Sequence, residues 1–184
     1  MEQLVREGKI RYMGVSNYNA GQLREFEKTR KIDVLQPPYH LFRRDIEHEI
    51  LPYCRSHGIG VLVYGPLAHG LLGGGYTHRT TFANDDWRSK SPAFHGELLQ
   101  RNLKVVERLK GLAQREGITV AQLAIAWVLA NPAVDVAIVG ARRPQQLVQT
   151  APAADIRLSQ DTLREIEQTM QDAVPTGGPS PEGT

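Results

Sequence analysis

Residues 137–147 read Ala137-Ile138-Val139-Gly140-Ala141-Arg142-Arg143-Pro144-Gln145-Gln146-Leu147. A short apolar run leads into a glycine, two arginines and a proline. This order predicts a strand, a turn and a helix, since proline suits the first helical turn. The free N–H groups of a helix start and the guanidinium groups of arginines both bind anions. The stretch therefore predicts a site for a nucleotide phosphate, and the alternative is a surface corner with two solvated arginines.

The rest of the chain alternates short β-branched runs with helical patterns, which is typical of a parallel α/β fold. Strands are expected at residues 9–15, 32–35, 60–64 and 137–139. Helices are expected at residues 20–29, from about Ile46 through Tyr53 with a stop at Gly58, and at residues 98–116, 120–130, 144–150 and 159–171, with Thr119 and Ser159 as caps. Ligands of parallel sheets and barrels bind at the carboxyl edge of the strands, where this chain places its polar residues.

Two segments follow no regular pattern. Residues 68–96 are rich in glycine and polar residues, and loops of this length are usually functional lids or disordered insertions. The tail at residues 175–184 is rich in proline, glycine and serine and is expected to be disordered. The chain is therefore interpreted as one domain, residues 1–174, followed by this tail.

Composition excludes several functions. The formal net charge of +2 is too small to predict binding to nucleic acid or to an anionic membrane surface. No stretch reaches the roughly 18 consecutive apolar residues of a membrane helix, and the first residues lack the apolar core of a signal peptide. Cys54 is the one cysteine, so no disulfide can form within the chain. His48 and His57 do not show metal-ligand spacing, so no metal is predicted, and a cytoplasmic setting is the default.

Four segments carry a resemblance to a known family. They are residues 8–17 (GKIRYMGVSN), 36–39 (QPPY), 64–68 (YGPLA) and 138–144 (IVGARRP). In residues, order and spacing they resemble the aldo-keto reductases, from Leu4 to about Met170. The resemblance implies a (β/α)8 barrel of the TIM-barrel type that binds NADP(H) without a Rossmann domain. It covers only the second half of that barrel, which comprises four strand–helix units and a C-terminal helix.

The resemblance implies that polar side chains hold the nicotinamide carboxamide of the cofactor. This group has one acceptor and two N–H donors, which Ser16, Asn17 and Gln36 at adjoining strand ends can satisfy. A Ser-Asn pair after a strand is also a common capping turn. Tyr64 resembles the family's aromatic residue that lies against the nicotinamide ring, and its alternative is a core tyrosine.

Other positions match the remainder of the cofactor site. The pyrophosphate is bordered in relatives by positions that match Gly65, Leu67 and His69. The adenosine end is matched by Gly140, Arg142, Arg143, Gln146 and Thr150. A guanidinium there favours the 2′-phosphate of NADPH over the free hydroxyl of NADH, so NADPH is the expected cofactor.

Two positions depart from the family pattern. Residues 73–76 read Gly-Gly-Gly-Tyr where relatives commonly carry a lysine. Thr150 stands where relatives usually have an asparagine that holds the adenine. Both departures bear on cofactor affinity.

The family's catalytic Asp, Tyr, Lys and His belong to the half of the barrel that this chain does not match, so no catalytic residue is assigned. Tyr39 and His40 are adjacent, but neighbours in an extended segment point to opposite sides, and no lysine is near to lower the tyrosine pKa. We therefore expect the cofactor-binding half of an NADPH-dependent oxidoreductase. The complete barrel would reduce aldehydes or ketones to alcohols, while the chain alone would reduce nothing.

Alternatives to this interpretation remain. The chain could be a noncatalytic NADPH-binding or interaction module, or an inert truncated product. In a half barrel the first and last strands expose unpaired edges and apolar faces. A second copy of the chain or a separate N-terminal half would cover them, and NADP(H) and a small carbonyl substrate would be the ligands of the completed barrel.

Overall fold

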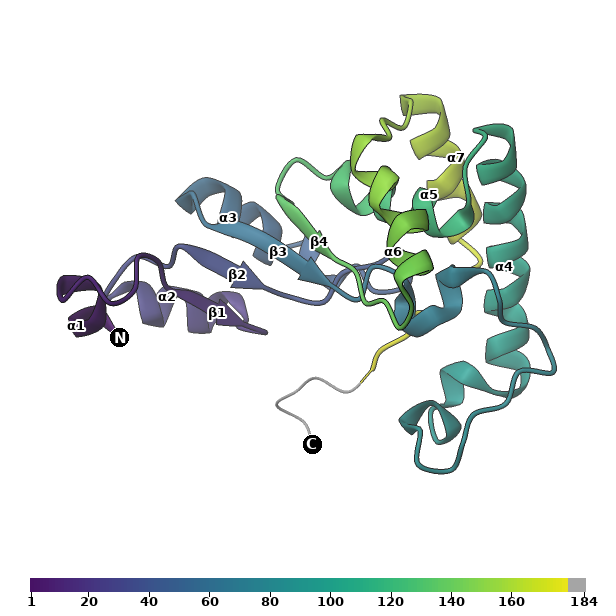
Figure 1. Ribbon diagram of the computed structural model, residues 1–184, viewed down its shortest axis with the longest axis horizontal. Helices are drawn as coiled ribbons and strands as arrows, with labels where there is room; N and C mark the ends of the chain where they lie inside the picture. The colour runs from purple at the N-terminus through teal and green to yellow at the C-terminus, as the bar shows by residue number, and fades with distance from the viewer. Residues whose placement is uncertain (179–184) are drawn as a thin grey trace.

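The computed structural model describes residues 1–178, and its centre is a parallel sheet of four strands (Figure 1). The strands are β1 (Gly14–Ser16), β2 (Val34–Gln36), β3 (Gly60–Tyr64) and β4 (Val136–Ile138). They lie in the order β1-β2-β3-β4, so each strand pairs with the next along the chain. The expected α/β class with a parallel sheet is confirmed, and within the described residues β1 and β4 are the two edges.

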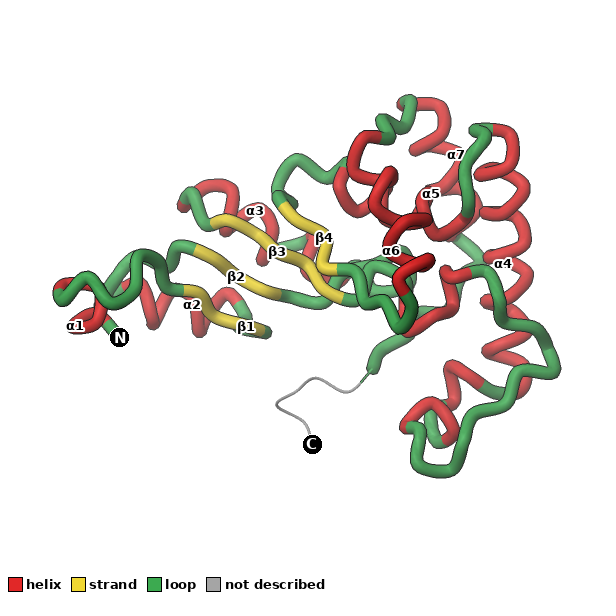
Figure 2. The backbone as a smooth tube through the Cα atoms, viewed as in Figure 1, coloured by secondary structure: helices red, strands yellow, loops and turns green. Residues whose placement is uncertain are grey.

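Helices connect the strands and extend beyond them (Figure 2). They are α1 (Glu2–Arg6), α2 (Ala20–Glu27), α3 (Ile50–His57), α4 (Gly96–Arg115), α5 (Val120–Leu129), α6 (Pro144–Thr150) and α7 (Gln160–Met170). The predicted caps are confirmed, because the side chains of Thr119 and Ser159 accept hydrogen bonds from backbone N–H groups in the first turns of α5 and α7. Helix α3 ends, as predicted, at Gly58, which adopts the left-handed conformation with φ of 62°.

Several predicted boundaries are wrong. The first strand begins at Gly14 rather than at residue 9, because the amides of Lys9 and Ile10 both donate to the Leu4 oxygen and close the end of α1. The second and fourth strands are displaced from residues 32–35 and 137–139 to Val34–Gln36 and Val136–Ile138. The helix expected from about Ile46 starts later, at Ile50, since a separate 3-10 turn η1 (Asp45–Glu47) precedes it.

The segment at residues 68–96 is ordered and contains three short 3-10 helices, η2 (Ala68–Gly73), η3 (Trp87–Ser89) and η4 (Pro92–Phe94). The prediction of an irregular loop is therefore wrong at these three places. Figure 1 shows the segment leaving the sheet and returning beside the start of the long helix α4. The 3-10 helices η2 and η4 both pack against α4.

One face of the sheet forms the core. Leu35, Val61 and Val63 are fully buried there, and helices α3 and α5 pack against β3 and β4. Alternation along the strands turns the intervening residues to the opposite face. On that face Val136 and Ile138 of β4 are 44% and 38% exposed. The sheet is thus covered by helices on one side and open on the other.

The amino ends of the strands carry two matching hydrogen bonds. The Asp33 carboxylate, just before β2, accepts from the Met13 amide at 2.8 Å. The Asp135 carboxylate, just before β4, accepts from the Val61 amide of β3 at the same distance. Each aspartate joins its strand to the preceding strand. The amino ends of the strands are therefore held together by side-chain hydrogen bonds as well as by the backbone hydrogen bonds of the sheet.

The first residues after α7 lie against the domain. Thr176 is buried, and its amide donates to the Phe42 oxygen at 2.9 Å. The sequence predicts a disordered tail from Pro175, but Thr176 has a defined and buried position in the structure. The last part of this tail, residues 179–184, lies outside the described residues. Over residues 1–178, none of the helices has the length and apolar character needed to cross a membrane.

Candidate functional site

The carboxyl ends of β1 and β2 bring together the first three predicted cofactor residues. Ser16 and Gln36 are register partners in the parallel ladder. The Ser16 hydroxyl donates to the Gln36 backbone oxygen at 2.9 Å, and the backbone N–H of Asn17 donates to the same oxygen at 3.2 Å. These contacts fix the turn that presents Ser16 and Asn17 beside Gln36.

Asn17 holds a polar group that the protein itself does not satisfy. Its backbone is left-handed, with φ of 59°, a conformation that asparagine tolerates better than most residues. Its side-chain oxygen accepts from the Tyr64 hydroxyl at 3.0 Å, which leaves the side-chain nitrogen as the donor. That nitrogen is buried and has no hydrogen-bond partner in the part of the chain that the structure describes. Because buried donors are normally paired, this site is suited to a ligand that carries an acceptor such as a carbonyl oxygen.

The turn after β3 is a run of left-handed residues. Gly65 has φ of 70°, and Ala68, His69 and Gly70 have φ of 48°, 56° and 98°. Left-handed conformations are strained for residues with a side chain, so Ala68 and His69 depend on their surroundings to stay there. Two donors meet the His69 oxygen, the Tyr76 hydroxyl at 2.8 Å and the Arg88 guanidinium at 2.9 Å. Leu67, also predicted to border the cofactor, lies between Gly65 and Ala68 in this turn and is half-buried.

Arg88 is the centre of the segment at residues 68–96. Its guanidinium binds the Asp86 carboxylate through two nitrogens and donates to the Tyr76 hydroxyl at 2.5 Å. It also lies over the Phe82 ring, 4.6 Å from the centroid. These hydrogen bonds from Arg88 lower the pKa of Asp86 to about 2. No local sequence pattern points to Arg88 itself, although Asp86, two positions before it, is a recognisable turn residue and caps η3.

The His69 side chain is enclosed by aromatic rings. Its ring lies edge-on to Trp87 and to Phe94, with centroids 4.7 Å and 6.3 Å away. Burial, with the charges of Arg88 and Arg43, lowers the pKa of His69. The imidazole is therefore neutral at physiological pH, so its side chain contributes no positive charge to a phosphate site.

The start of α6 carries the predicted adenosine-end residues. The Gln146 side-chain oxygen accepts from the amides of Arg142 and Arg143 at 2.7 Å and 3.1 Å, which fixes the turn. Both arginines are exposed, as is Gly140. The Thr150 hydroxyl donates to the Gln146 backbone oxygen at 2.8 Å and is thus used within its own helix.

The predicted residues form two groups in the fold. Ser16, Asn17, Gln36 and Tyr64 form one group through direct contacts of neighbouring strand ends. Arg142, Arg143 and Gln146 form the other group through hydrogen bonds at the start of α6. The first group lies at the carboxyl ends of β1, β2 and β3 and the second follows β4, as the sequence predicts for a ligand site.

Tyr39 and His40 point to different surroundings. Tyr39 packs against Trp127, with centroids 5.1 Å apart, and donates to the Glu47 carboxylate at 2.6 Å. Burial and the Glu47 contact raise its pKa, so it is a poor proton donor. His40 is also buried, with its ring centroid 6.0 Å from that of His69, and neither of its ring nitrogens has a hydrogen-bond partner among the described residues.

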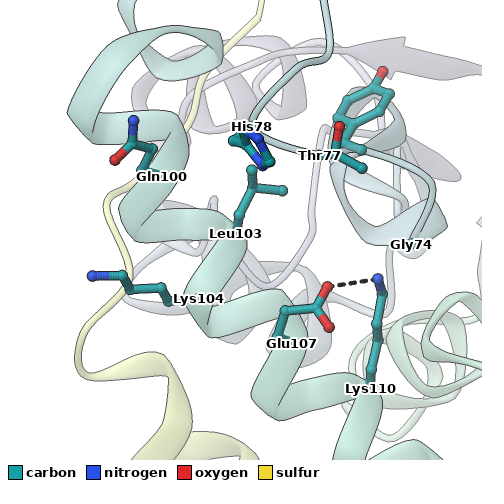
Figure 3. Close-up of a pocket in the computed structure, with 9 residues that line it drawn as sticks. Gly74, Thr77, His78, Gln100, Leu103, Lys104, Glu107 and Lys110 are labelled. Carbon is teal, nitrogen blue, oxygen red and sulfur yellow. Dashed lines mark hydrogen bonds and ion pairs between the residues drawn. The ribbon is translucent and has the colours of Figure 1, made fainter.

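Figure 3 shows a pocket of about 580 Å³ between α4 and residues 74–78. Gln100, Lys104 and Lys110 of α4 contribute polar groups, and Lys110 is paired with Glu107 at 2.7 Å. None of the predicted cofactor residues lines this pocket. In residues 1–178 no group of three or more His, Cys, Asp or Glu side chains is arranged to hold a metal ion.

Comparison with known proteins gives consistent matches over nearly the whole chain. The model of the Aldo/keto reductase family matches residues 1–171. The chain is 36% identical to aldo-keto reductase YhdN of Bacillus subtilis over 95% of its own length and 53% of the relative. It is 37% identical to probable aldo-keto reductase 1 of Glycine max, over 96% of the chain and 50% of the relative. For aldo-keto reductase yakc [NADP(+)] of Schizosaccharomyces pombe the identity is 31%, over 100% and 55%.

Solved structures show the same relationship. The glycerol dehydrogenase AKR11B4 from Gluconobacter oxydans superposes with a TM-score of 0.89 at 34% identity, over 96% of this chain and 54% of that chain. The thermostable aldo-keto reductase Tm1743, solved with the inhibitor epalrestat, superposes with a TM-score of 0.69 at 28% identity, over 92% and 52%. The chain spans about half the length of the relatives it matches.

Proposed function

Because the chain belongs to the aldo/keto reductase family, we propose that it is the cofactor-binding half of an NADPH-dependent oxidoreductase barrel that reduces aldehydes or ketones. The observation that carries the proposal is the buried Asn17 side-chain nitrogen, a donor with no hydrogen-bond partner among residues 1–178. A carboxamide oxygen supplies the acceptor that this donor lacks. Four parallel strands with their polar residues at the carboxyl edge support the second half of a (β/α)8 barrel.

The strand ends divide the work of holding the nicotinamide. In the proposed complex Asn17 donates to the carboxamide oxygen, while Ser16 and Gln36 accept hydrogen bonds from its N–H groups. Tyr64 orients the Asn17 amide through their hydrogen bond and offers its ring as a wall for the nicotinamide. Bound NADPH supplies a hydride for the carbonyl carbon, and the residues of this chain supply orientation.

The start of α6 is the proposed adenosine end. The exposed guanidinium groups of Arg142 and Arg143 are available to a 2′-phosphate, and Gln146 holds their backbone in place. The Schizosaccharomyces pombe relative carries NADP(+) in its name, which supports the same cofactor here. Between the two ends, the turn from Gly65 to His69 is proposed to border the pyrophosphate.

The open face of the sheet is the proposed junction with the rest of the barrel. Val136 and Ile138 expose apolar side chains on the sheet face, and Leu147 and Val148 of α6 are 55% and 74% exposed. Apolar area of this kind is usually covered. We propose that an N-terminal half, or a second copy of the chain, covers it and that the N-terminal half brings the catalytic groups. A cytoplasmic setting is part of the proposal, since Cys54 is a free, buried thiol.

Titration of the chain with NADPH, followed by the fluorescence of the reduced nicotinamide, tests the proposal. Asn17→Asp keeps the size and backbone tolerance of the side chain but replaces the unpaired donor with a carboxylate. We expect saturable binding by the unmodified chain and a loss of at least about tenfold in affinity for the variant. Asn84→Asp, at an exposed position, is the matched control and should bind like the unmodified chain.

Absence of binding by the folded chain, or equal binding by Asn17→Asp, would contradict the cofactor assignment. If the chain binds NADPH, addition of an N-terminal half of the barrel distinguishes a reductase from a noncatalytic binding module. Carbonyl-dependent loss of NADPH absorbance in the mixture supports the reductase. Cofactor binding without turnover in a stable complex supports the module.

A further inference from the structure

We propose that Arg88 is a positioning residue that holds the turn at residues 68–70 in the conformation needed to border the cofactor. This inference rests on the proposed function, since it concerns the same site. Arg88 acts through the backbone of the turn: its guanidinium donates to the His69 oxygen at 2.9 Å.

The turn needs such a restraint. Ala68, His69 and Gly70 are three consecutive left-handed residues, and only the last is a glycine. Non-glycine residues persist in this conformation only when their surroundings hold them there. Leu71 and Leu72, which follow the turn directly, are fully buried and anchor its carboxyl end. The His69 carbonyl oxygen within the turn is held by side chains from elsewhere in the chain.

Trp87 and Arg88, neighbours in η3, supply it from two sides. The Trp87 ring lies edge-on to the His69 ring at 4.7 Å, while Arg88 binds the His69 carbonyl. We call these two residues the η3 clamp. Tyr76 supports the clamp, because its hydroxyl donates a hydrogen bond to the His69 oxygen and accepts one from Arg88. A Cβ atom at Gly70 would come within 2.4 Å of the Tyr76 hydroxyl oxygen, so the turn and the clamp are closely fitted.

The clamp is itself rigid. The Arg88 side chain is 15% exposed and binds Asp86 through two of its nitrogens. A planar, forked guanidinium can serve Asp86, Tyr76 and the His69 carbonyl together, whereas a lysine ammonium of the same charge cannot match this geometry.

The test compares Arg88→Lys with the control Arg79→Lys, an exposed arginine in the same segment. NADPH affinity is measured by titration, and backbone and Asn17 side-chain amide shifts are followed by NMR at saturating NADPH. For Arg88→Lys we expect affinity to fall about five- to tenfold. We expect the NADPH-induced shifts at His69 and Gly70 to shrink while those at Asn17 persist. Arg79→Lys should behave like the unmodified chain.

A general loss of stability would not produce this selective pattern. Equal affinity in Arg88→Lys, or uniform loss of the shifts at both ends, would overturn the inference while leaving the proposed function intact. No NADPH-induced shift at His69 in the unmodified chain would overturn the inference and the pyrophosphate assignment of this turn, while saturable binding with shifts at Asn17 would still support the nicotinamide site. If the unmodified chain binds no NADPH, the proposed function fails first and the inference falls with it. Should Arg88→Lys not fold, Tyr76→Phe decides, since it removes one of the two donors to His69 and is expected to show the same pattern.

Discussion

The Tyr64 hydroxyl donates to the Asn17 side-chain oxygen across 3.0 Å, although the two residues are 47 positions apart in the chain. The bond joins the carboxyl ends of β3 and β1, two strands separated by β2. It also decides which side-chain atom of Asn17 remains free. A tyrosine that the sequence presents as a flat wall for a ring is therefore also the residue that orients an amide.

Replacement of Tyr64 by phenylalanine removes this bond and keeps the ring. We expect NADPH affinity to fall about fivefold, because a neutral hydrogen bond contributes roughly 1 kcal/mol. Titration by nicotinamide fluorescence measures the effect. Tyr12→Phe is the control, since Tyr12 is 70% exposed. Unchanged affinity in Tyr64→Phe would show that the Asn17 amide needs no orienting partner.

Arg142→Ala is expected to separate NADPH from NADH. Loss of a guanidinium contact to a phosphate costs about 1.5–3 kcal/mol, which is roughly a 10- to 150-fold loss of NADPH affinity. NADH lacks the 2′-phosphate, so its affinity should change little. Parallel titrations with the two nucleotides give the ratio, and Arg55→Ala, exposed on α3, is the control. A parallel loss for both nucleotides would contradict the phosphate contact.

Arg44 is expected to stabilise the fold more than a similar surface arginine. It binds Glu47 and Glu167, lies 5.0 Å from the Trp127 ring centroid, and is 30% exposed. Arg44→Ala should lower the free energy of unfolding by about 1–2 kcal/mol. Arg24→Ala, in an exposed pair with Glu49, should cost less than about 0.5 kcal/mol. Urea unfolding followed by circular dichroism compares them, and equal losses would argue against the network.

Stability is expected to fall with acidification because of His40. Burial, with the nearby charges of His69 and Arg43, lowers its pKa to about 3, whereas an unfolded histidine titrates near 6.5. Below pH 6.5 the His40 side chain therefore binds a proton in the unfolded state but not in the folded state. About 2 kcal/mol of stability is lost between pH 7 and pH 5 for this reason. This contribution is fully present above pH 7.

His40→Leu should flatten this pH dependence without costing a hydrogen bond to any of residues 1–178, since neither ring nitrogen has a partner there. The control is His78→Leu at an exposed position. Its free energy of unfolding should depend on pH as that of the unmodified chain does. Chemical unfolding at pH 7, 6 and 5 provides the slopes. An unaltered slope in His40→Leu would mean that another group dominates.

The fold was largely predictable because strand ends and caps are local signals. Gly58 and Thr119 end or begin helices through their own backbone and side-chain chemistry, so the sequence was sufficient there. The start of β1 was not predictable in the same way. It depends on the Lys9 and Ile10 amides folding back on the Leu4 oxygen, a choice that apolar periodicity does not reveal.

Part of the candidate site could likewise be predicted from the sequence, and part of it could not. Ser16, Asn17 and Gln36 lie together because parallel strands end at one edge, which the alternation of strands and helices predicts. The η3 clamp was missed because residues 68–96 have no periodicity and their order comes from one arginine with four partners. Such a network depends on distances between residues 12 to 19 positions apart, and no local pattern encodes it.

The aspartates at the amino ends of the strands have a consequence for how this scaffold tolerates change. Asp33 and Asp135 secure neighbouring strands at the edge opposite the polar residues. Substitutions at the carboxyl edge leave those bonds intact, so their cost to folding is limited to the contacts they replace. The evolvability of the chain therefore lies at one end of its strands and its robustness at the other.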